Sequence, residues 1–249
     1  MNITGVGSKI DYGTIASGKR INSASDDAAG MAIAKKLETQ AQGQTTGAAN
    51  AKDGKGVIDI ADGALSGVQD YLQRIKELSV KAMNGTNSAA DLKNIQKEID
   101  ASLGGIQQTA KGTEYNTMKL LDGSMANMDI ATNPDGTGMK IQMANSTLEA
   151  LGIDGYNVTG KFDMGKIDAA LEQVSASRSE LGATSNALDS AYESATSGAI
   201  QQTASQSRIE DLDIPKAISE MKKNEVLEDY KVMMQKKQME EESLVTKLL

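Results

Sequence analysis

Apolar residues recur at helical spacing over four long stretches of the 249-residue chain. The regular pattern lies within residues 27–83, where an apolar or small residue returns at alternating intervals of three and four: Ile58, Ala61, Leu65, Val68, Leu72 and Ile75. Residues 89–111 and 164–207 have the same period, and residues 215–249 combine it with alternating charges. Four long helices are therefore predicted, and their heptads favour coiled-coil packing.

The connections between these stretches differ in kind. Residues 84–88 form a turn so short that the second helix must return antiparallel to the first. Within residues 115–160, apolar and polar residues alternate on both sides of a glycine-rich turn: Met128 and Ile130 before it, and Met139, Ile141 and Met143 after it. The predicted fold is mainly α, a long antiparallel coiled-coil helical bundle with a small β-hairpin element.

Residues 1–25 are rich in Gly and Ser and predict only a weak amphipathic segment, broken near Ser17 and Gly18. Ser25 and Asp26 are expected to cap the long helix that follows. Gly43 and Gly47 lie four apart on one face of that helix, as do Gly63 and Gly67. Each exposed helical glycine costs about 1 kcal/mol against alanine, which favours close interhelical contact, with local flexibility as the alternative.

The last predicted helix carries large apolar side chains that nothing nearby in the sequence can cover. They are Val226, Leu227, Tyr230, Met233, Met234, Leu244, Val245 and Leu248. An isolated helix of this kind is marginal in water. Covering about half of its apolar area would yield on the order of 10 kcal/mol before entropy. These residues therefore predict self-assembly with other copies of the chain.

Composition excludes several functions. The chain has no Cys and no His, which excludes thiolate nucleophiles, imidazole chemistry and the usual zinc sites. The net charge of −8 disfavours nucleic-acid binding. The turn at residues 133–138 lacks calcium ligands, because Ala131 and Gln142 occupy the first and twelfth positions. We expect no enzyme activity, no cofactor, no membrane span and no cleavable signal peptide.

Several sequence blocks together resemble bacterial flagellin. Residues 17–34, SGKRINSASDDAAGMAIA, resemble the N-terminal signature of that family nearly residue for residue. Further blocks follow in family order at residues 72–80, 84–88, 91–99, 166–171, 178–183 and 207–211. The blocks cover most of residues 17–214, and as a set they are highly specific.

The resemblance implies a subunit of the extracellular flagellar filament that polymerises with itself. Residues 1–25 and 208–249 would form an inner domain. Residues 26–160, with two helices and the hairpin region, and the third helix at residues 161–207 would form a rod-like core. Export would use the flagellar type III apparatus, with an export chaperone at the C-terminal helix. The variable outer domains of longer members are not expected.

The resemblance also implies recognition by Toll-like receptor 5. The positions that match the receptor contacts of the family are Arg74, Leu78 and Glu98. Arg74 and Leu78 are four apart and could present together on one helix face. The alternatives are a solvated ion-pairing face for Arg74 and Glu98 and a widened core stripe for Leu78.

Two features depart from the family pattern. The segment before Asp26 is shorter than is usual in the family. Lys237 and Glu241 occupy heptad positions of the last helix at which apolar residues are expected. Two other functions therefore remain open at this point. One is a hook–filament junction or minor filament protein, and the other is a secreted helical adhesin or effector, which would stay monomeric at high concentration.

Overall fold

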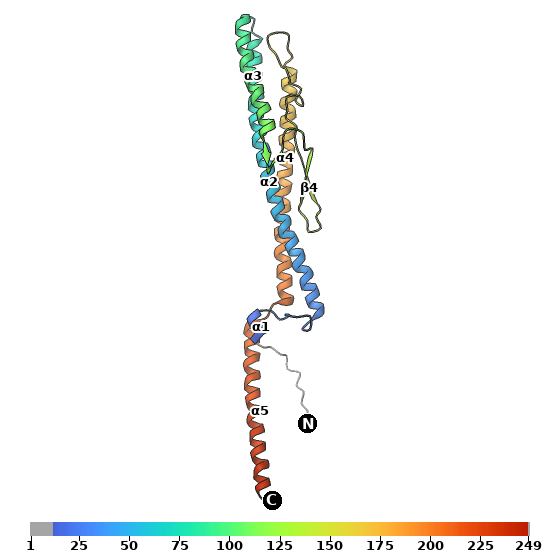
Figure 1. Ribbon diagram of the computed structural model, residues 1–249, viewed down its shortest axis with the longest axis vertical. Helices are drawn as coiled ribbons and strands as arrows, with labels where there is room; N and C mark the ends of the chain where they lie inside the picture. The colour runs from blue at the N-terminus through green and yellow to red at the C-terminus, as the bar shows by residue number, and fades with distance from the viewer. Residues whose placement is uncertain (1–11, 249) are drawn as a thin grey trace. The chain divides into compact units, whose positions relative to one another are not determined.

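The computed structural model describes residues 12–248, with side chains described for residues 13–240. The chain is mainly helical, as expected (Figure 1). Its helices are α1 (Tyr12–Ser17), α2 (Ala28–Ala82), α3 (Ala89–Gly112), α4 (Gly165–Glu210) and α5 (Ile214–Leu248). The four long helices begin and end close to the predicted positions, which confirms the heptad interpretation.

Two short antiparallel strand pairs lie between α3 and α4. Strands β3 (Asn127–Ala131) and β4 (Gly138–Gln142) form the predicted hairpin, with Met128 opposite Ile141. Strands β1 (Glu114–Tyr115) and β2 (Met118–Lys119) form a second pair that the sequence pattern did not predict. The turn between β1 and β2 places Asn116 and Thr117 at φ values of 46° and 67°. Such values are uncommon for residues other than glycine and costly for a β-branched one.

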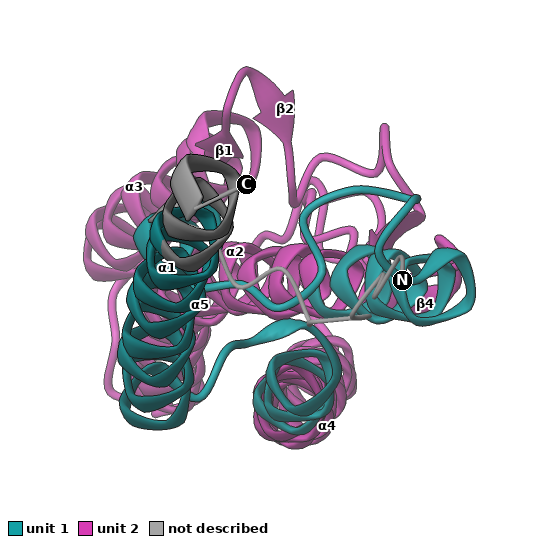
Figure 2. Ribbon diagram, turned by 90° about the horizontal axis from the view of Figure 1, so that it is seen from below, with its two compact units in different colours: residues 1–41, 200–249 teal, residues 42–199 magenta. Residues whose placement is uncertain are grey.

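The described chain divides into two compact units, which Figure 2 distinguishes by colour. Residues 42–199 form one unit, which we call the core unit. Residues 1–41 and 200–249 form the other, which we call the terminal unit. In the core unit, heptad residues of α2, α3 and α4 pack together with apolar residues of the intervening loops. The side chains of largest volume in this core are fully buried: Leu65, Leu72, Ile75, Ile99, Ile106, Leu120, Leu121, Ile141, Ile153, Ile167 and Leu181.

The β3–β4 hairpin lies against glycines of α2. A Cβ atom on Gly47 would be 2.2 Å from the carbonyl oxygen of Thr132, and one on Gly43 would be 2.7 Å from Pro134. Gly43 and Gly47 therefore do permit a close contact, but with the hairpin, so the interhelical contact expected at this pair was wrong. The close-contact interpretation is also wrong for Gly63 and Gly67, because no atom lies within 4 Å of a Cβ built at either position.

The loop that follows β4 is fixed to α2 and α3 by buried hydrogen bonds. The hydroxyl of Tyr156 donates to Ser79 Oγ at 3.0 Å, and Ser79 Oγ donates to the carbonyl oxygen of Ile75 at 2.7 Å. The side chain of Gln96 accepts from Val158 N at 2.7 Å and donates to the carbonyl oxygen of Tyr156 at 3.0 Å. These bonds satisfy polar groups that would otherwise be costly to bury.

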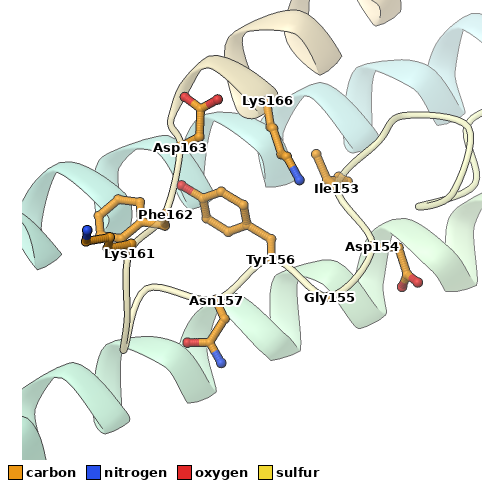
Figure 3. Close-up of a pocket in the computed structure, with 9 residues that line it drawn as sticks. All are labelled: Ile153, Asp154, Gly155, Tyr156, Asn157, Lys161, Phe162, Asp163 and Lys166. Atoms are coloured by element: carbon orange, nitrogen blue, oxygen red, sulfur yellow. The ribbon is translucent and has the colours of Figure 1, made fainter.

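A pocket of about 420 Å³ opens beside this loop (Figure 3). Ile153 and Tyr156 form its apolar part, and the exposed side chains of Asp154, Lys161 and Lys166 surround it. Burial raises the pKa of Tyr156, in agreement with a hydroxyl that is shielded from water. The ring of Phe162 meets that of Tyr156 edge to face, with centroids 6.1 Å apart.

The N-terminal cap of α2 differs from the prediction by one residue. Asp27, not Ser25 or Asp26, caps the helix, because its carboxylate accepts from Gly30 N at 2.8 Å. The carboxylate of Asp26 instead closes the preceding turn, where it accepts from Ser23 N at 2.8 Å. The backbone hydrogen bond from Ser23 is the main reason that the pKa of Asp26 is lowered.

Candidate functional site

Helix α5 presents an uncovered apolar face in the terminal unit. Every side chain from Lys222 to Glu240 is exposed. Seven of these residues are apolar, and five of the seven lie within one stripe of the helix surface, at positions 0, 1, 4, 7 and 8 counted from Val226; Val232 and Met239 lie on the other side. The exposed fractions of the five are 66% for Val226, 46% for Leu227, 61% for Tyr230, 70% for Met233 and 42% for Met234. The structure therefore brings these five predicted assembly residues together on one face.

The other three predicted assembly residues cannot be placed in the same way. Leu244, Val245 and Leu248 belong to α5, but their side chains lie outside the described residues. Lys237, which departs from the heptad pattern, is exposed, and Glu241 lies outside the described side chains. The described part of the apolar face therefore runs from residue 226 to residue 234.

The N-terminal segment of the terminal unit is joined to the α4–α5 connection by backbone hydrogen bonds. Arg20 N donates to the carbonyl oxygen of Glu210 at 2.7 Å, and Leu212 N donates to the carbonyl oxygen of Gly18 at 2.9 Å. Gly18 has a φ of 68°, which lets the chain turn sharply after α1. Ile21 is buried, with an exposed fraction of 2%. These contacts place α1 beside the start of α5.

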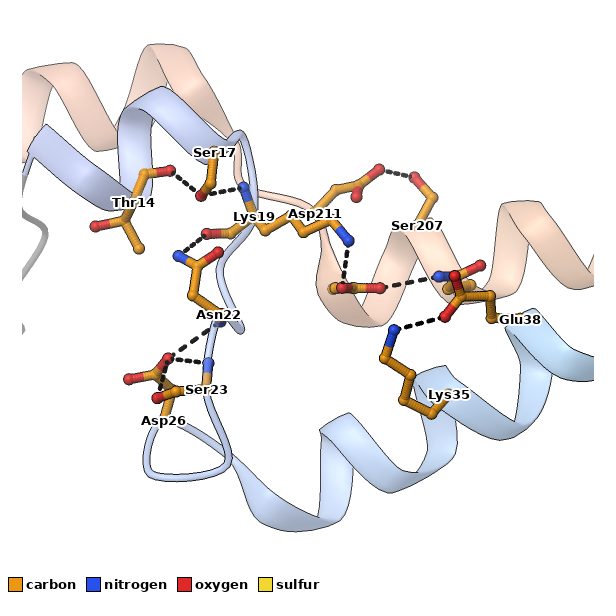
Figure 4. Close-up of polar contacts among 12 residues, drawn as sticks. Thr14, Ser17, Lys19, Asn22, Ser23, Asp26, Lys35, Glu38, Ser207 and Asp211 are labelled. Atoms are coloured by element: carbon orange, nitrogen blue, oxygen red, sulfur yellow. Dashed lines mark hydrogen bonds and ion pairs between the residues drawn. The ribbon is translucent and has the colours of Figure 1, made fainter.

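An ion pair between a half-exposed lysine and a buried glutamate lies at the same connection, and we call it the clasp (Figure 4). Lys19 Nζ lies 2.6 Å from Glu210 Oε1, and Gln206 Nε2 donates to Glu210 Oε2 at 2.9 Å. The hydrogen bond from Lys19 lowers the pKa of Glu210, and the hydrogen bond to Glu210 raises the pKa of Lys19. The sequence pattern does not predict this pair, because no periodicity links residues so far apart along the chain.

The predicted receptor residues Arg74 and Glu98 meet on the surface of the core unit. Arg74 Nε donates to Glu98 Oε1 at 3.0 Å, and Arg74 Nη1 lies 3.1 Å from Glu77 Oε2. About half of each side chain of the Arg74–Glu98 pair is exposed, at 50% and 49%. The pair joins α2 to α3 across their antiparallel contact and leaves donors and acceptors accessible to solvent.

Leu78 does not share this surface. Its exposed fraction is 2%, and it belongs to the apolar core with Ile75 and Ile95. The expectation that Arg74 and Leu78 present together was therefore wrong. Helix α2 packs against α3 and against the loop that carries Tyr156, so its buried face is wider than one heptad seam. The widened-stripe alternative is correct for Leu78.

The described residues show neither a metal site nor a membrane span. They contain no group of three or more carboxylate side chains arranged to hold a metal ion. Their helices are also too short or too polar to cross a membrane. The features that distinguish this part of the chain are two surfaces, the apolar face of α5 and the charged Arg74–Glu98 surface.

Two family models match the chain. The model of the bacterial flagellin N-terminal helical region matches residues 12–126, and the model of the bacterial flagellin C-terminal helical region matches residues 164–248. The chain belongs to the flagellin family. Only residues 127–163 of this flagellin lie between the two matched regions, and they hold the β3–β4 hairpin and the following loop. It is therefore a short family member without the variable domain.

Curated relatives agree with this assignment. The chain is 42% identical to a flagellin of Escherichia coli over 163 residues, which are 65% of this chain and 29% of the relative. It is 42% identical to a phase 1 flagellin of Salmonella naestved over 147 residues, 59% of this chain and again 29% of the relative. The chain thus spans less than a third of the length of these relatives in the matched regions.

Solved structures support the fold alone, because their sequence identities are low. A Bacillus cereus flagellin superposes with a TM-score of 0.53 at 23% identity, covering 59% of this chain and 88% of that chain. A putative flagellar hook-associated protein from Vibrio parahaemolyticus superposes with a TM-score of 0.63 at 15% identity. The superposition covers 75% of this chain and 100% of that chain. The long-helix bundle is common to both.

Proposed function

We propose that the chain is a structural subunit that polymerises into the extracellular bacterial flagellar filament. The observation that carries this proposal is the uncovered apolar face of α5, on a chain that belongs to the flagellin family. Along residues 222–240 this helix is exposed on all sides, so it gains no packing energy there from the described part of its own chain. Contact with other copies would supply that energy.

The size of this gain follows from the exposed fractions. Fully burying an apolar side chain of this size contributes about 1.5–3 kcal/mol. Burying what remains exposed of Val226, Leu227, Tyr230, Met233 and Met234 would therefore contribute roughly 4–9 kcal/mol. Association itself costs on the order of 4–15 kcal/mol. One such contact is too weak for a stable dimer, whereas a subunit held by several neighbours in a polymer would be stable.

The remaining parts of the proposal concern organisation and export. Residues 1–25 and 208–249 would form the inner domain of the filament, and residues 26–160 and 161–207 its rod-like core. Export would proceed through the flagellar type III apparatus. A chaperone that covers the apolar face of α5 before export would prevent premature association, since this face is exposed in the single chain.

Substitution of the apolar face in the full-length chain tests the proposal. In the variant L227S/Y230S/M234S, assembly onto filament seeds should be lost, whereas the helical content of the monomer should stay unchanged because all three side chains are exposed. The matched control N224S/E228S/Q235S alters three exposed residues on the opposite side of α5 and should assemble normally. Electron microscopy scores the outcome, and normal assembly of the first variant would contradict the proposal.

We also propose that the surface around Arg74 and Glu98 is recognised by Toll-like receptor 5. The exposed ion pair supports this, because its free donors and acceptors suit a charged partner. Leu78 would support this part of α2 from the core and would not contact the receptor directly.

Direct binding measurements test this surface. Arg74→Ala should weaken the affinity for the receptor by about tenfold, the effect of losing one charged contact. Lys55→Ala provides the matched control, because Lys55 also forms an exposed ion pair in the core unit, with Asp189 at 2.5 Å. Equal affinities for the two variants would argue against the surface.

A further inference from the structure

The turn between α2 and α3 contains the pair Asn84-Gly85, and this is the only Asn-Gly step in the sequence. Both residues are exposed. An asparagine can lose its side-chain amide when the backbone nitrogen of the next residue attacks its Cγ carbon. A glycine at the next position permits this attack most readily, because it has no Cβ to hinder the approach. The turn therefore has the sequence and the exposure that this reaction needs.

The local geometry favours the attack. Thr86 N donates to Asn84 Oδ1 at 3.2 Å, which folds the side chain of Asn84 back along its own main chain. The ring closed by this hydrogen bond contains both the Cγ carbon of Asn84 and the nitrogen of Gly85. The hydrogen bond also draws electron density from the side-chain carbonyl. Among the described residues, no hydrogen-bond acceptor holds the N–H of Gly85, so the attacking nitrogen is accessible.

Asn87, three residues later in the same turn, is arranged in the opposite way. Its side-chain Nδ2 donates to the carbonyl oxygen of Lys81 at 2.6 Å, which holds the amide at the end of α2. The residue that follows it is Ser88, whose nitrogen donates to Asp91 Oδ2 at 3.0 Å as part of the capping box of α3. Both the amide and the potential attacking nitrogen are therefore engaged, and the next residue carries a side chain.

We propose that Asn84 is a site of spontaneous deamidation in the folded protein. The nitrogen of Gly85 loses its proton to solvent base and forms a bond to Cγ of Asn84, and the bond from Cγ to Nδ2 breaks with release of ammonia. Water then opens the resulting succinimide at either carbonyl. Overall, one water molecule is consumed and one ammonia is released, and an aspartate or an isoaspartate remains at position 84.

The product differs from the parent turn in charge and in backbone length. A carboxylate replaces a neutral amide just beyond the C-terminal end of α2, where the helix dipole disfavours negative charge. Isoaspartate also adds one carbon atom to the main chain of the turn. The modification therefore alters the tip of the α2–α3 pair without touching the buried core.

Gly85→Ala is a specific probe of this chemistry. Gly85 does not have a positive φ, and no atom lies within 4 Å of a Cβ built on it, so alanine fits the native turn. The added methyl group hinders the attacking nitrogen without changing Asn84. Asn87 in the unaltered chain serves as an internal control that needs no substitution.

The experiment incubates the full-length protein in mildly alkaline buffer and follows each asparagine by peptide mass spectrometry and isoaspartate-specific methylation. Asn84 should be converted several-fold faster than Asn87, and Gly85→Ala should slow its conversion to the rate of Asn87. In denaturant the difference between the two asparagines should shrink, because Asn87 loses its protecting hydrogen bonds. An Asn84 as stable as Asn87 in the folded chain, or a rate unaffected by Gly85→Ala, would overturn the proposal.

Discussion

Removal of the Ser79 hydroxyl should destabilise the core unit more than removal of the Tyr156 hydroxyl. Ser79 has an exposed fraction of 0% and Tyr156 one of 6%, and the two hydroxyls are 3.0 Å apart. In Ser79→Ala, the buried Tyr156 hydroxyl loses its acceptor, which costs about 1–3 kcal/mol. In Tyr156→Phe, Ser79 still donates to the carbonyl oxygen of Ile75, so the cost falls to about 0.5–1.5 kcal/mol.

Thermal unfolding followed by far-ultraviolet circular dichroism measures both effects. For a unit of this size, a loss of about 2 kcal/mol lowers the Tm by roughly 4–8 °C. The double variant S79A/Y156F completes a cycle, and its cost should fall short of the sum of the single costs by about 1 kcal/mol, since neither hydroxyl is then left alone. Additive costs, or a Tyr156→Phe variant less stable than Ser79→Ala, would refute the assigned bond.

Two further predictions concern the clasp and the β1–β2 turn. Because Lys19 lowers the pKa of Glu210, the carboxylate stabilises the terminal unit above the usual glutamate pKa of about 4.5, and this stability is lost as the pH falls below it. Glu210→Gln should lower the stability of the terminal unit by about 1 kcal/mol at neutral pH and should remove this pH dependence. Hydrogen exchange of the Leu212 amide measures both effects. A pH dependence that is unchanged in the variant would contradict the clasp. Thr117→Gly should raise the stability by about 0.5–1 kcal/mol, because glycine relieves the strain at a φ of 67° and loses part of the gain to unfolded-chain entropy. A lower Tm for this variant would contradict that reasoning.

The long helices could be predicted because each carries its own signal along the sequence. Heptads such as Leu65, Val68 and Leu72 become fully buried, with exposed fractions of 0%. The β3–β4 hairpin could be predicted equally well, since the alternation of apolar and polar residues around a glycine-rich turn is a local pattern. Local periodicity therefore fixed the fold class and most element boundaries.

Features that depend on tertiary packing could not be predicted in this way. Leu78 lies beside the heptad seam and not on it, so the heptad pattern does not mark its burial in the core. The clasp joins Lys19 to Glu210 across 191 positions. Gly47 and Gly63 look alike in sequence, but only Gly47 lies beneath the hairpin. The exposure of residues 226–234 on α5 was predicted correctly, because no described part of the chain covers them. Their contact with other copies stays a prediction.

Seeded polymerisation of the purified full-length chain tests the filament proposal most directly. Short filament fragments are added to the monomer, and electron microscopy records whether they lengthen. The account predicts helical fibres that grow in proportion to the added chain, with α5 inaccessible to proteases once assembled. A chain that remains a stable monomer at high concentration in the presence of seeds, with α5 still open to proteolysis, would contradict it.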